Sequence, residues 1–505
     1  MSLIARSSLI IAVFFAIDKG LGFIRQVLVA REFGLTYNID VFNAANNIPD
    51  LLSALISGGA LGVALIPVLS EYLELRGRQE VWDLFSRILN LAFLTTAGFS
   101  IIIIILAKPL VEYIIAPGFP PIQQALTSEL MRLDLFAILI FSISGLVMAG
   151  LQANQHFLLP AMAPAMYNLG QIFGIAILAP SEGITIGSIT LPAFGLGIHG
   201  LVYGVIIGAF LHLSIQIPGL IHFHFRWTPA INLRNPGVVK VLYLLGPRIL
   251  TMFFLQVFFI TRDNLASGLG EGAVTALNYG WFIMQVPETM IGTAIAIAIL
   301  PTLSELFALG KREQYGSTIN HAVRVLLALT IPAAALLAVV LPPLVEFIFG
   351  FDSAGTQLVV WVTRAYLLGL TGHTLLEISA RSFYAQQDAK TPLFVAALNA
   401  LMYIFFAVAL SRFIGAVGIA LANTIAFTGE ALLLLYLLKR RGVRFPQTSR
   451  TIIRAVIGAA CGAALGILLL QLPFSSILMA FLSLGFGCLV AAPFIWPELK
   501  LLIQL

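Results

Sequence analysis

Long apolar runs recur along the whole chain and determine which elements the sequence predicts. A hydrocarbon core about 30 Å thick needs about 20 apolar residues per helix, and fourteen such runs are present. They lie near residues 8–33, 39–70, 84–107, 128–153, 158–179, 196–221, 238–265, 272–303, 317–346, 358–386, 392–412, 416–438, 452–472 and 476–496. Strands of a membrane barrel would instead alternate over about ten residues. The pattern predicts an all-α polytopic membrane protein with about 14 transmembrane helices.

The polar positions between these runs predict the orientation of the chain. Lysine and arginine favour cytoplasmic loops, and most of them fall in alternate loops, on one side of the membrane. These residues are Arg76, Arg78, Arg87, Arg226, Arg234, Lys240, Lys311, Arg312, Arg324, Lys390, Lys439, Arg440, Arg441, Arg444 and Arg450. With an even number of spans, both termini are expected on that cytoplasmic side. The first run has no A-x-A cleavage site, so we interpret it as a retained helix.

Short sequence echoes indicate an internal repeat. IPVLSE at 66–71 is echoed by LPTLSE at 300–305, and a basic loop follows each. LQANQHFLLP and IPD are echoed in the same order by FYAQQDAKTP and VPE, offset by roughly 231–238 residues. The pattern predicts two pseudo-symmetric six-helix lobes, 1–225 (helices 1–6) and 230–440 (helices 7–12). Two C-terminal helices follow at 450–505, and glycines 458, 462 and 466 give the first of them a face suited to close helix packing.

Composition supports a membrane protein and narrows the functional classes. Hydrophobic residues make up 59% of the 505 positions and charged residues 10%, against about 25% charged in soluble domains. A soluble globule, a disordered chain and a disulfide scaffold are therefore excluded. The net charge of +5 is explained by the basic loops, so no nucleic-acid partner is expected. The two cysteines, Cys461 and Cys488, lie in apolar runs, where redox chemistry is not expected.

Two similar lobes in one membrane chain favour transport over catalysis. Repeated lobes with a site at their interface are the architecture of secondary transporters, whereas channels usually surround a pore with four or five units. The chain has no GxxxxGK[ST] phosphate loop, and its loops are too short to house a catalytic domain. We therefore expect no enzymatic activity, no cofactor and no metal site. A membrane glycosyltransferase or acyltransferase is the disfavoured alternative from another class.

Charged residues within the apolar runs are the candidate site. Such charges are costly in a bilayer and usually face a cavity or pathway. The first lobe contributes Lys19 and Arg25 in the first helix and Asp40 at the start of the second helix. Asp18 precedes Arg25 by seven residues, which places the two side chains on the same face of the first helix. Arginine offers bidentate contacts to phosphate oxygens, which favours an anionic or amphiphilic substrate. A purely structural contact between Asp18 and Arg25 is an open alternative.

The second lobe contributes Arg248, Arg262, Asp263 and Glu288 as candidate substrate-binding residues. Arg262 and Asp263 can equally be solvated at the non-cytoplasmic end of the seventh helix. Glu377 and Arg381 have the i,i+4 spacing of a structural ion pair. The sequence leaves these alternatives open.

Seven stretches of the chain form an ordered set of motifs. They are LGFIRQVLVAREFG (21–34), DVFNAANNIPDLL (40–52), GALGVALIPVLSEY (59–72), APGF (116–119), LPAMAPAMYN (159–168), LGPRIL (245–250) and FYAQQDAKTP (383–392). In this order they resemble the MurJ (MviN) lipid II flippase family of the MOP transporter superfamily. They extend from the N-terminus to about residue 440, and the two trailing helices fit the family's fourteen-span layout. Each stretch is modest alone, but the ordered set is specific.

The resemblance implies a flippase of the bacterial inner (plasma) membrane that carries an undecaprenyl-diphosphate-linked glycopeptide to the periplasmic leaflet by alternating access. It implies that Arg25 matches a cavity arginine, that Asp40 matches an acidic position, and that Lys19 replaces an arginine. It also implies a groove for the lipid tail at helices 13 and 14. We expect a monomer among membrane lipids, driven by the membrane potential or by H⁺ or Na⁺.

The chain departs from the family at two cavity positions. Ser53 and Phe282 stand where the family commonly has arginine, and Arg248 or Arg262 is a candidate to supply the missing charge. These departures keep open a second function, the export of another polyprenyl-linked glycan or glycolipid. A drug or cation antiporter is disfavoured because the predicted cavity is basic.

Overall fold

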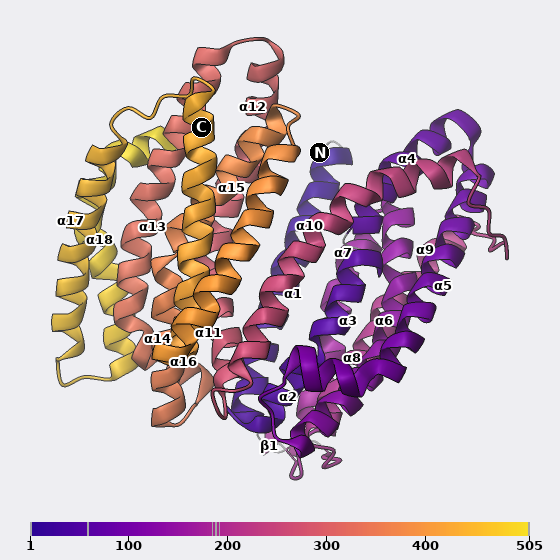
Figure 1. The fold of residues 1–505 in the computed structure, drawn as a ribbon, viewed down its shortest axis with the longest axis horizontal. Helices are drawn as coiled ribbons and strands as arrows, with labels where there is room; N and C mark the ends of the chain where they lie inside the picture. Colours follow the sequence, from indigo (N-terminus) through magenta and orange to yellow (C-terminus); the bar gives the residue numbers. More distant parts are fainter. Residues whose placement is uncertain (1–2, 58–59, 184, 187–188, 191, 503–505) are drawn as a thin grey trace. The chain divides into compact units, whose positions relative to one another are not determined.

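The chain folds as a helical membrane protein in a computed structural model that describes residues 3–57, 60–183, 185–186, 189–190 and 192–502. Each of the fourteen apolar runs coincides with helical structure in its described residues. Within that part of the chain, nine helices are long and apolar enough to cross a membrane. The predicted all-α polytopic fold is therefore confirmed (Figure 1).

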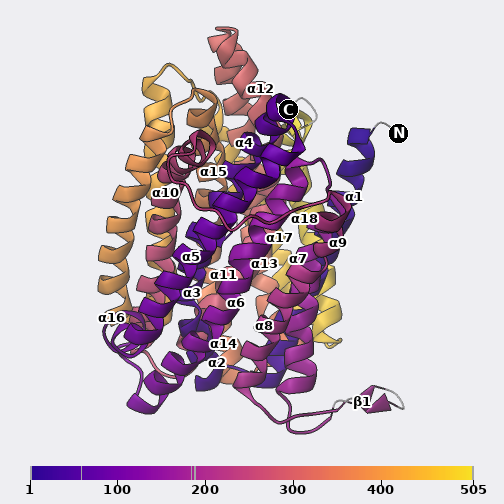
Figure 2. The same ribbon diagram turned by 90° about the vertical axis from the view of Figure 1, so that its right-hand side faces the viewer.

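The structure forms two compact units, Met1–Gly268 and Leu269–Leu505. The helical elements of unit 1 are α1 (Leu3–Phe33), α2 (Tyr37–Ala45), α3 (Asn47–Leu52), η1 (Ser53–Ser57), α4 (Ala60–Arg76), α5 (Arg78–Leu110), η2 (Val111–Ile115), α6 (Pro121–Ala153), α7 (Leu158–Phe173), η3 (Gly174–Leu178), α8 (Ile198–Ser214), α9 (Ile217–His222) and α10 (Pro236–Ala266). Two short antiparallel strands, β1 (Thr185–Ile186) and β2 (Ile189–Thr190), form a hairpin between η3 and α8 (Figure 2).

Unit 2 contains the remaining helices. They are α11 (Ala273–Pro287), η4 (Glu288–Thr293), α12 (Ala294–Ala308), α13 (Arg312–Phe349), α14 (Ser353–Leu368), α15 (Leu370–Ala385), α16 (Lys390–Arg440), α17 (Thr448–Leu470) and α18 (Ser476–Leu502). The elements labelled η are π-helical turns. α16 is interrupted at Ile414 and Gly415, between the two runs that the sequence predicted there.

Unit 1 ends at Gly268, later than the predicted first lobe, because α10 packs against α4 and α5 and so belongs to unit 1. Val238 and Val241 of α10 are buried in one apolar cluster with residues of α4 and α5. Near the other end of α10, the Ser267 hydroxyl accepts a hydrogen bond from the Gly118 amide at 3.0 Å. The units are defined by packing and the lobes by the sequence repeat, so the lobe boundaries at 225 and 230 stay a prediction.

The two units repeat two unusual backbone features at matching sequence positions. A π-helical turn begins at Ser53 and again at Glu288, each shortly after a proline of the echoed IPD and VPE stretches. Gln155 and Gln387, both in the loop of the second echo, have φ of 60° and 59°. Because non-glycine residues rarely adopt positive φ, this recurrence agrees with the repeat that the sequence echoes predict.

The C-terminal helices α17 and α18 pack together through the small-residue face that the sequence predicted (Figure 1). Gly458, Gly462 and Gly466 are buried on α17. A Cβ atom on Gly462 would lie 2.7 Å from the carbonyl oxygen of Gly487 in α18. Glycine therefore permits this close backbone approach, as small residues do in membrane helices.

Candidate functional site

Helix α1 carries an exposed cation next to an anchored acid. The Asp18 Oδ1 atom accepts a hydrogen bond of 2.8 Å from Asn168 Nδ2 of α7. The Lys19 Nζ atom lies 3.9 Å from Asp18 Oδ2, and 66% of the Lys19 side chain is exposed. In the described residues the ion-pair partner of Asp18 is therefore Lys19, and the alternative contact with Arg25 is not formed. The Lys19 ammonium group is available to an anionic ligand.

Arg25 is half-buried two turns further along α1. Its guanidinium group interacts electrostatically with the carboxylate of Asp50 in α3 and with Tyr167 in α7. The Asp50 carboxylate interacts in turn with that of Asp134 in α6. The first unit thus links charged groups of α1, α3 and α6 in the order Arg25, Asp50 and Asp134.

Asp134 was missed by the sequence analysis. Its side chain is only 4% exposed, and its Oδ1 atom has no hydrogen-bond partner among the described residues. An acid inside the apolar run 128–153 is a signal of the same kind as the charges that were selected. It could therefore have been found from the sequence, but its proximity to Asp50 could not.

Asp40 lies in the first turn of α2 and has no exposed surface. The partial positive charge of a helix N-terminus stabilises a carboxylate placed there. In this conformation the Asp40 side chain is therefore part of the packed interior of unit 1. A direct contact with substrate would require a different conformation of the start of α2.

Arg262 and Asp263 form a buried ion pair near the end of α10. The Arg262 Nε atom donates to Asp263 Oδ1 at 2.7 Å, and the two side chains are 7% and 1% exposed. Asn47 Nδ2 of α3 donates to Asp263 Oδ2 at 2.8 Å. The pair is thus buried rather than solvated, and it joins α10 to α3. The Arg262 charge is already balanced by a carboxylate.

Three further residues concern the two arginines that the family commonly has and this chain lacks, and they lie on α10, η1 and α11. Arg248 lies in α10, and its side chain is outside the described part of the structure. Ser53 and Phe282 are both half-buried, the first at the start of η1 and the second in α11. Neither of these two residues brings a cation to its position.

Glu288 of unit 2 lies at the start of η4, close to an ion pair on α15. Its Oε1 atom accepts a hydrogen bond of 3.2 Å from the Thr293 hydroxyl. Arg381 interacts electrostatically with Glu288 and forms an ion pair with Glu377 one turn away. The predicted i,i+4 pair is therefore confirmed. The proximity of Glu288 to Arg381 depends on the packing of η4 against α15 and was not predicted.

These features define a polytopic α-helical membrane protein of the transporter class, in which a repeated helical design holds charged groups within apolar helices. The family model described as "Lipid II flippase MurJ" matches residues 29–487. The chain therefore belongs to the MurJ lipid II flippase family, as the sequence motifs predicted.

Relatives and solved structures agree with this membership. The chain is 29% identical to the lipid II flippase MurJ of Burkholderia cenocepacia over 461 residues, which cover 88% of this chain and 85% of the relative. It is 27% identical to the probable lipid II flippase MurJ of Vibrio cholerae over 448 residues, covering 85% and 82%.

Two solved structures share the fold. A lipid II flippase MurJ in an inward closed conformation matches with a TM-score of 0.82 and 21% identity, over 98% of this chain and all of that one. An inward-facing multidrug resistance MATE family transporter of the MOP superfamily matches with a TM-score of 0.68 and 14% identity, over 84% and 94%. Both likenesses concern the fold alone.

Proposed function

We propose that this chain flips lipid II, an undecaprenyl-diphosphate-linked glycopeptide, from the cytoplasmic to the periplasmic leaflet by alternating access. The observation that carries this proposal is the family match over residues 29–487. Relatives named as lipid II flippases, which align over more than four fifths of the chain, support it.

Lys19 and Arg25 are the proposed ligands of the substrate diphosphate. Lys19 is exposed, and Arg25 is half-buried among ionisable groups. A lysine gives a compact point charge, whereas an arginine can bind two phosphate oxygens at once. Asp40, Asp263 and Glu288 are proposed to orient the sugar or peptide groups, with Arg248 and Arg262 as additional cations in states where their side chains are accessible.

Depletion of the resident lipid II flippase in a rod-shaped bacterium, with rescue by this gene, tests the proposal. The wild-type gene should restore cell shape and lipid II turnover, and Arg25→Ala should abolish rescue because the main anion contact is lost. Arg25→Lys should rescue in part, since it keeps the charge but not the planar fork. Lys108→Ala is the matched control, because Lys108 is 73% exposed and pairs, among the described residues, with Glu112 alone.

The same experiment tests whether cations on α10 replace the family's missing arginines. Compensation predicts that Arg248→Ala or Arg262→Ala lowers flipping of a correctly folded protein. If both variants flip lipid II normally while Arg25→Ala does not, the compensation hypothesis is wrong.

A second candidate function is the export of another polyprenyl-linked glycan or glycolipid. Ser53 and Phe282, which stand where the family commonly has arginine, favour it. Failure of the wild-type gene to rescue, despite good membrane expression, would support this candidate. Purified protein in vesicles should then translocate a polyprenyl-linked glycan without peptide in preference to lipid II.

The cellular setting belongs to the same proposal. We infer a multi-pass monomer in the bacterial inner membrane with both termini in the cytoplasm, following the distribution of basic loops. The driving force is the membrane potential or an H⁺ or Na⁺ gradient. One charge moved through 100 mV provides about 2.3 kcal/mol, enough to bias a transport cycle. No cofactor and no catalytic step are part of the proposed cycle.

A further inference from the structure

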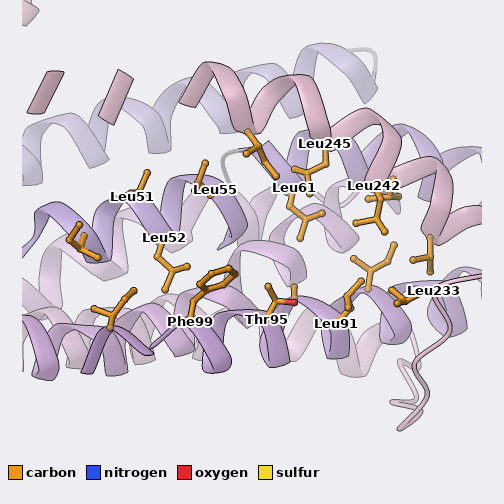
Figure 3. A pocket seen from close by; sticks show the side chains of 17 residues that line it. Leu51, Leu52, Leu55, Leu61, Leu91, Thr95, Phe99, Leu233, Leu242 and Leu245 are labelled. Carbon is orange, nitrogen blue, oxygen red and sulfur yellow. The ribbon is translucent and has the colours of Figure 1, made fainter. Parts of the chain in front are cut away.

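An apolar cavity of about 550 Å³ lies inside unit 1, between α10 and the helices α3, α4 and α5. Figure 3 shows leucine side chains directed into it from these elements, among them Leu51, Leu61, Leu91 and Leu242. Among its described lining residues, Thr95 has the one polar side chain. A cavity lined in this way offers water no hydrogen-bond partners, so its natural occupant is hydrocarbon.

The cavity is long enough for a lipid chain. Its lining residues on α5 extend from Ile88 to Ile103, and a rise of 1.5 Å per residue makes this stretch about 22 Å long. The hydrocarbon core of a bilayer is about 30 Å thick. The cavity therefore runs through much of the apolar depth of the membrane, where acyl chains are the available ligands.

One end of the cavity meets the loop that joins α9 to α10. Leu233 of this loop lines the cavity. The loop is fixed to α5, because Asn90 Nδ2 donates to the Thr228 carbonyl at 2.8 Å and Trp227 Nε1 donates to Asn90 Oδ1 at 2.8 Å. The apolar cavity thus ends beneath a loop that is held in place.

The same loop carries charge that complements a phosphate group. Arg226 and Arg234 are exposed, and neither forms an ion pair within the described part of the chain. The side chains of Trp227 and Leu233 are 57% and 56% exposed. Tryptophan with basic residues is typical of the membrane interface, and arginine binds phosphate oxygens well. The loop therefore suits an anionic headgroup directly above an apolar cavity.

We propose that unit 1 binds a resident anionic phospholipid from the leaflet next to the basic loops. Its phosphate lies against Arg234 and Arg226, and one of its acyl chains fills the cavity. The acyl chain fills the space where side chains of α10 and of α3–α5 do not touch one another, and so stabilises the packing of α10 against these helices. None of its lining residues is among the proposed substrate-binding residues, and the proposal does not depend on which lipid is transported.

Filling the cavity tests the acyl-chain part of the proposal. Native mass spectrometry of the purified full-length chain would measure binding of phosphatidylglycerol. Leu91→Trp should weaken binding roughly tenfold, whereas Leu94→Trp should not, because Leu94 lies on the same helix but is 52% exposed and outside the lining. Leu242→Trp repeats the test on α10, with Tyr243→Trp as its control, because the Tyr243 side chain is 81% exposed. Equal binding by the correctly folded cavity variants and their controls would overturn the proposal.

Changing the loop charge tests the headgroup part. Wild type should bind phosphatidylglycerol severalfold better than phosphatidylcholine with the same acyl chains, and Arg234→Gln should remove most of this preference. Arg450→Gln, an exposed arginine of unit 2, should keep it. Absence of any preference in wild type would overturn the anionic headgroup. Displacement of phosphatidylglycerol by equimolar undecaprenyl phosphate, prevented by Leu91→Trp, would show that the cavity holds a polyprenyl tail instead.

Discussion

At the scale of single residues, burial decides what a charged side chain contributes. Lys19 is 66% exposed and lies 3.9 Å from the Asp18 carboxylate, so its ammonium group can meet a ligand from solvent. Arg262 and Asp263 are almost fully buried and neutralise one another. The first arrangement suits anion binding, whereas the second holds α10 against α3 through Asn47.

Replacement of Asp263 by alanine should strongly destabilise unit 1. The buried guanidinium group of Arg262 would lose its counter-charge, and removal of one partner of a buried pair typically costs about 3–5 kcal/mol. Thermal unfolding of the purified protein in detergent should show a clear decrease in Tm. The double variant Arg262→Leu/Asp263→Leu should recover most of the loss, because it leaves no buried charge. If the Tm of Asp263→Ala equalled that of the wild-type protein, the proposed role of the ion pair would be wrong.

Asp388, in the loop between α15 and α16, should make stability depend on acid pH. Burial opposes ionisation, but hydrogen bonds from Thr391 and from Arg441 hold the pKa of Asp388 at about 2. The pKa of an unfolded aspartate is about 3.9. The ionised carboxylate therefore stabilises the fold above about pH 4, and this contribution is lost as the pH falls towards 2.

Asp388→Asn should accordingly lower the free energy of unfolding at pH 7 by about 1–2 kcal/mol after allowance for solvent screening. The difference from wild type should shrink as the pH falls below 4, as measured by denaturant unfolding at several pH values. Glu182→Gln, which changes an exposed acid in another loop, should show no such difference. A pH-independent effect of Asp388→Asn would rule out the proposed ionisation.

At the scale of elements, π-helical turns interrupt two of the long apolar runs. The run 39–70 becomes α2, α3, η1 and α4, and the run 272–303 becomes α11, η4 and α12. π-Helical turns of this kind often occur at functional sites. Here they begin at Ser53 and Glu288, which places backbone irregularity at matching points of the repeat.

Gly462→Ala should weaken the packing of α17 against α18. Its new Cβ atom would lie 2.7 Å from the Gly487 carbonyl oxygen, so the helices would have to separate. Overpacking of this kind costs about 1–3 kcal/mol. The matched control is Gly485→Ala on α18, where the new Cβ would have no described residue outside its own stretch of helix within 4 Å. Thermal unfolding should separate the two variants, and equal Tm values would contradict the close approach.

At the scale of the whole molecule, the basic loops predict the topology. In a background with Cys461→Ser and Cys488→Ser, an impermeant thiol reagent added to intact cells should label Glu182→Cys but not Asn232→Cys. The reason is that residue 232 lies in a basic loop, expected in the cytoplasm, whereas residue 182 lies in a loop on the opposite side. Permeabilised cells should show labelling at both positions. The reverse pattern in intact cells would overturn the predicted orientation.

The sequence by itself determined the helical membrane fold, the family and the α17 packing face, and it predicted the repeat. These properties depend on hydropathy over about 20 neighbouring residues and on short motifs, which are local along the chain. The glycines at 458, 462 and 466, for example, have a spacing that places them on one helical face whatever lies opposite.

Only the tertiary structure decided which charges meet. Asn47 and Asp263 are 216 positions apart, and no periodicity in the sequence connects them. The same is true of Asp134 with Asp50, and of the cavity between α5 and α10. Such contacts depend on how helices pack, and packing brings together side chains from several distant segments. For this reason the sequence could select Arg262 as a charge within the membrane, but not show that it is already paired.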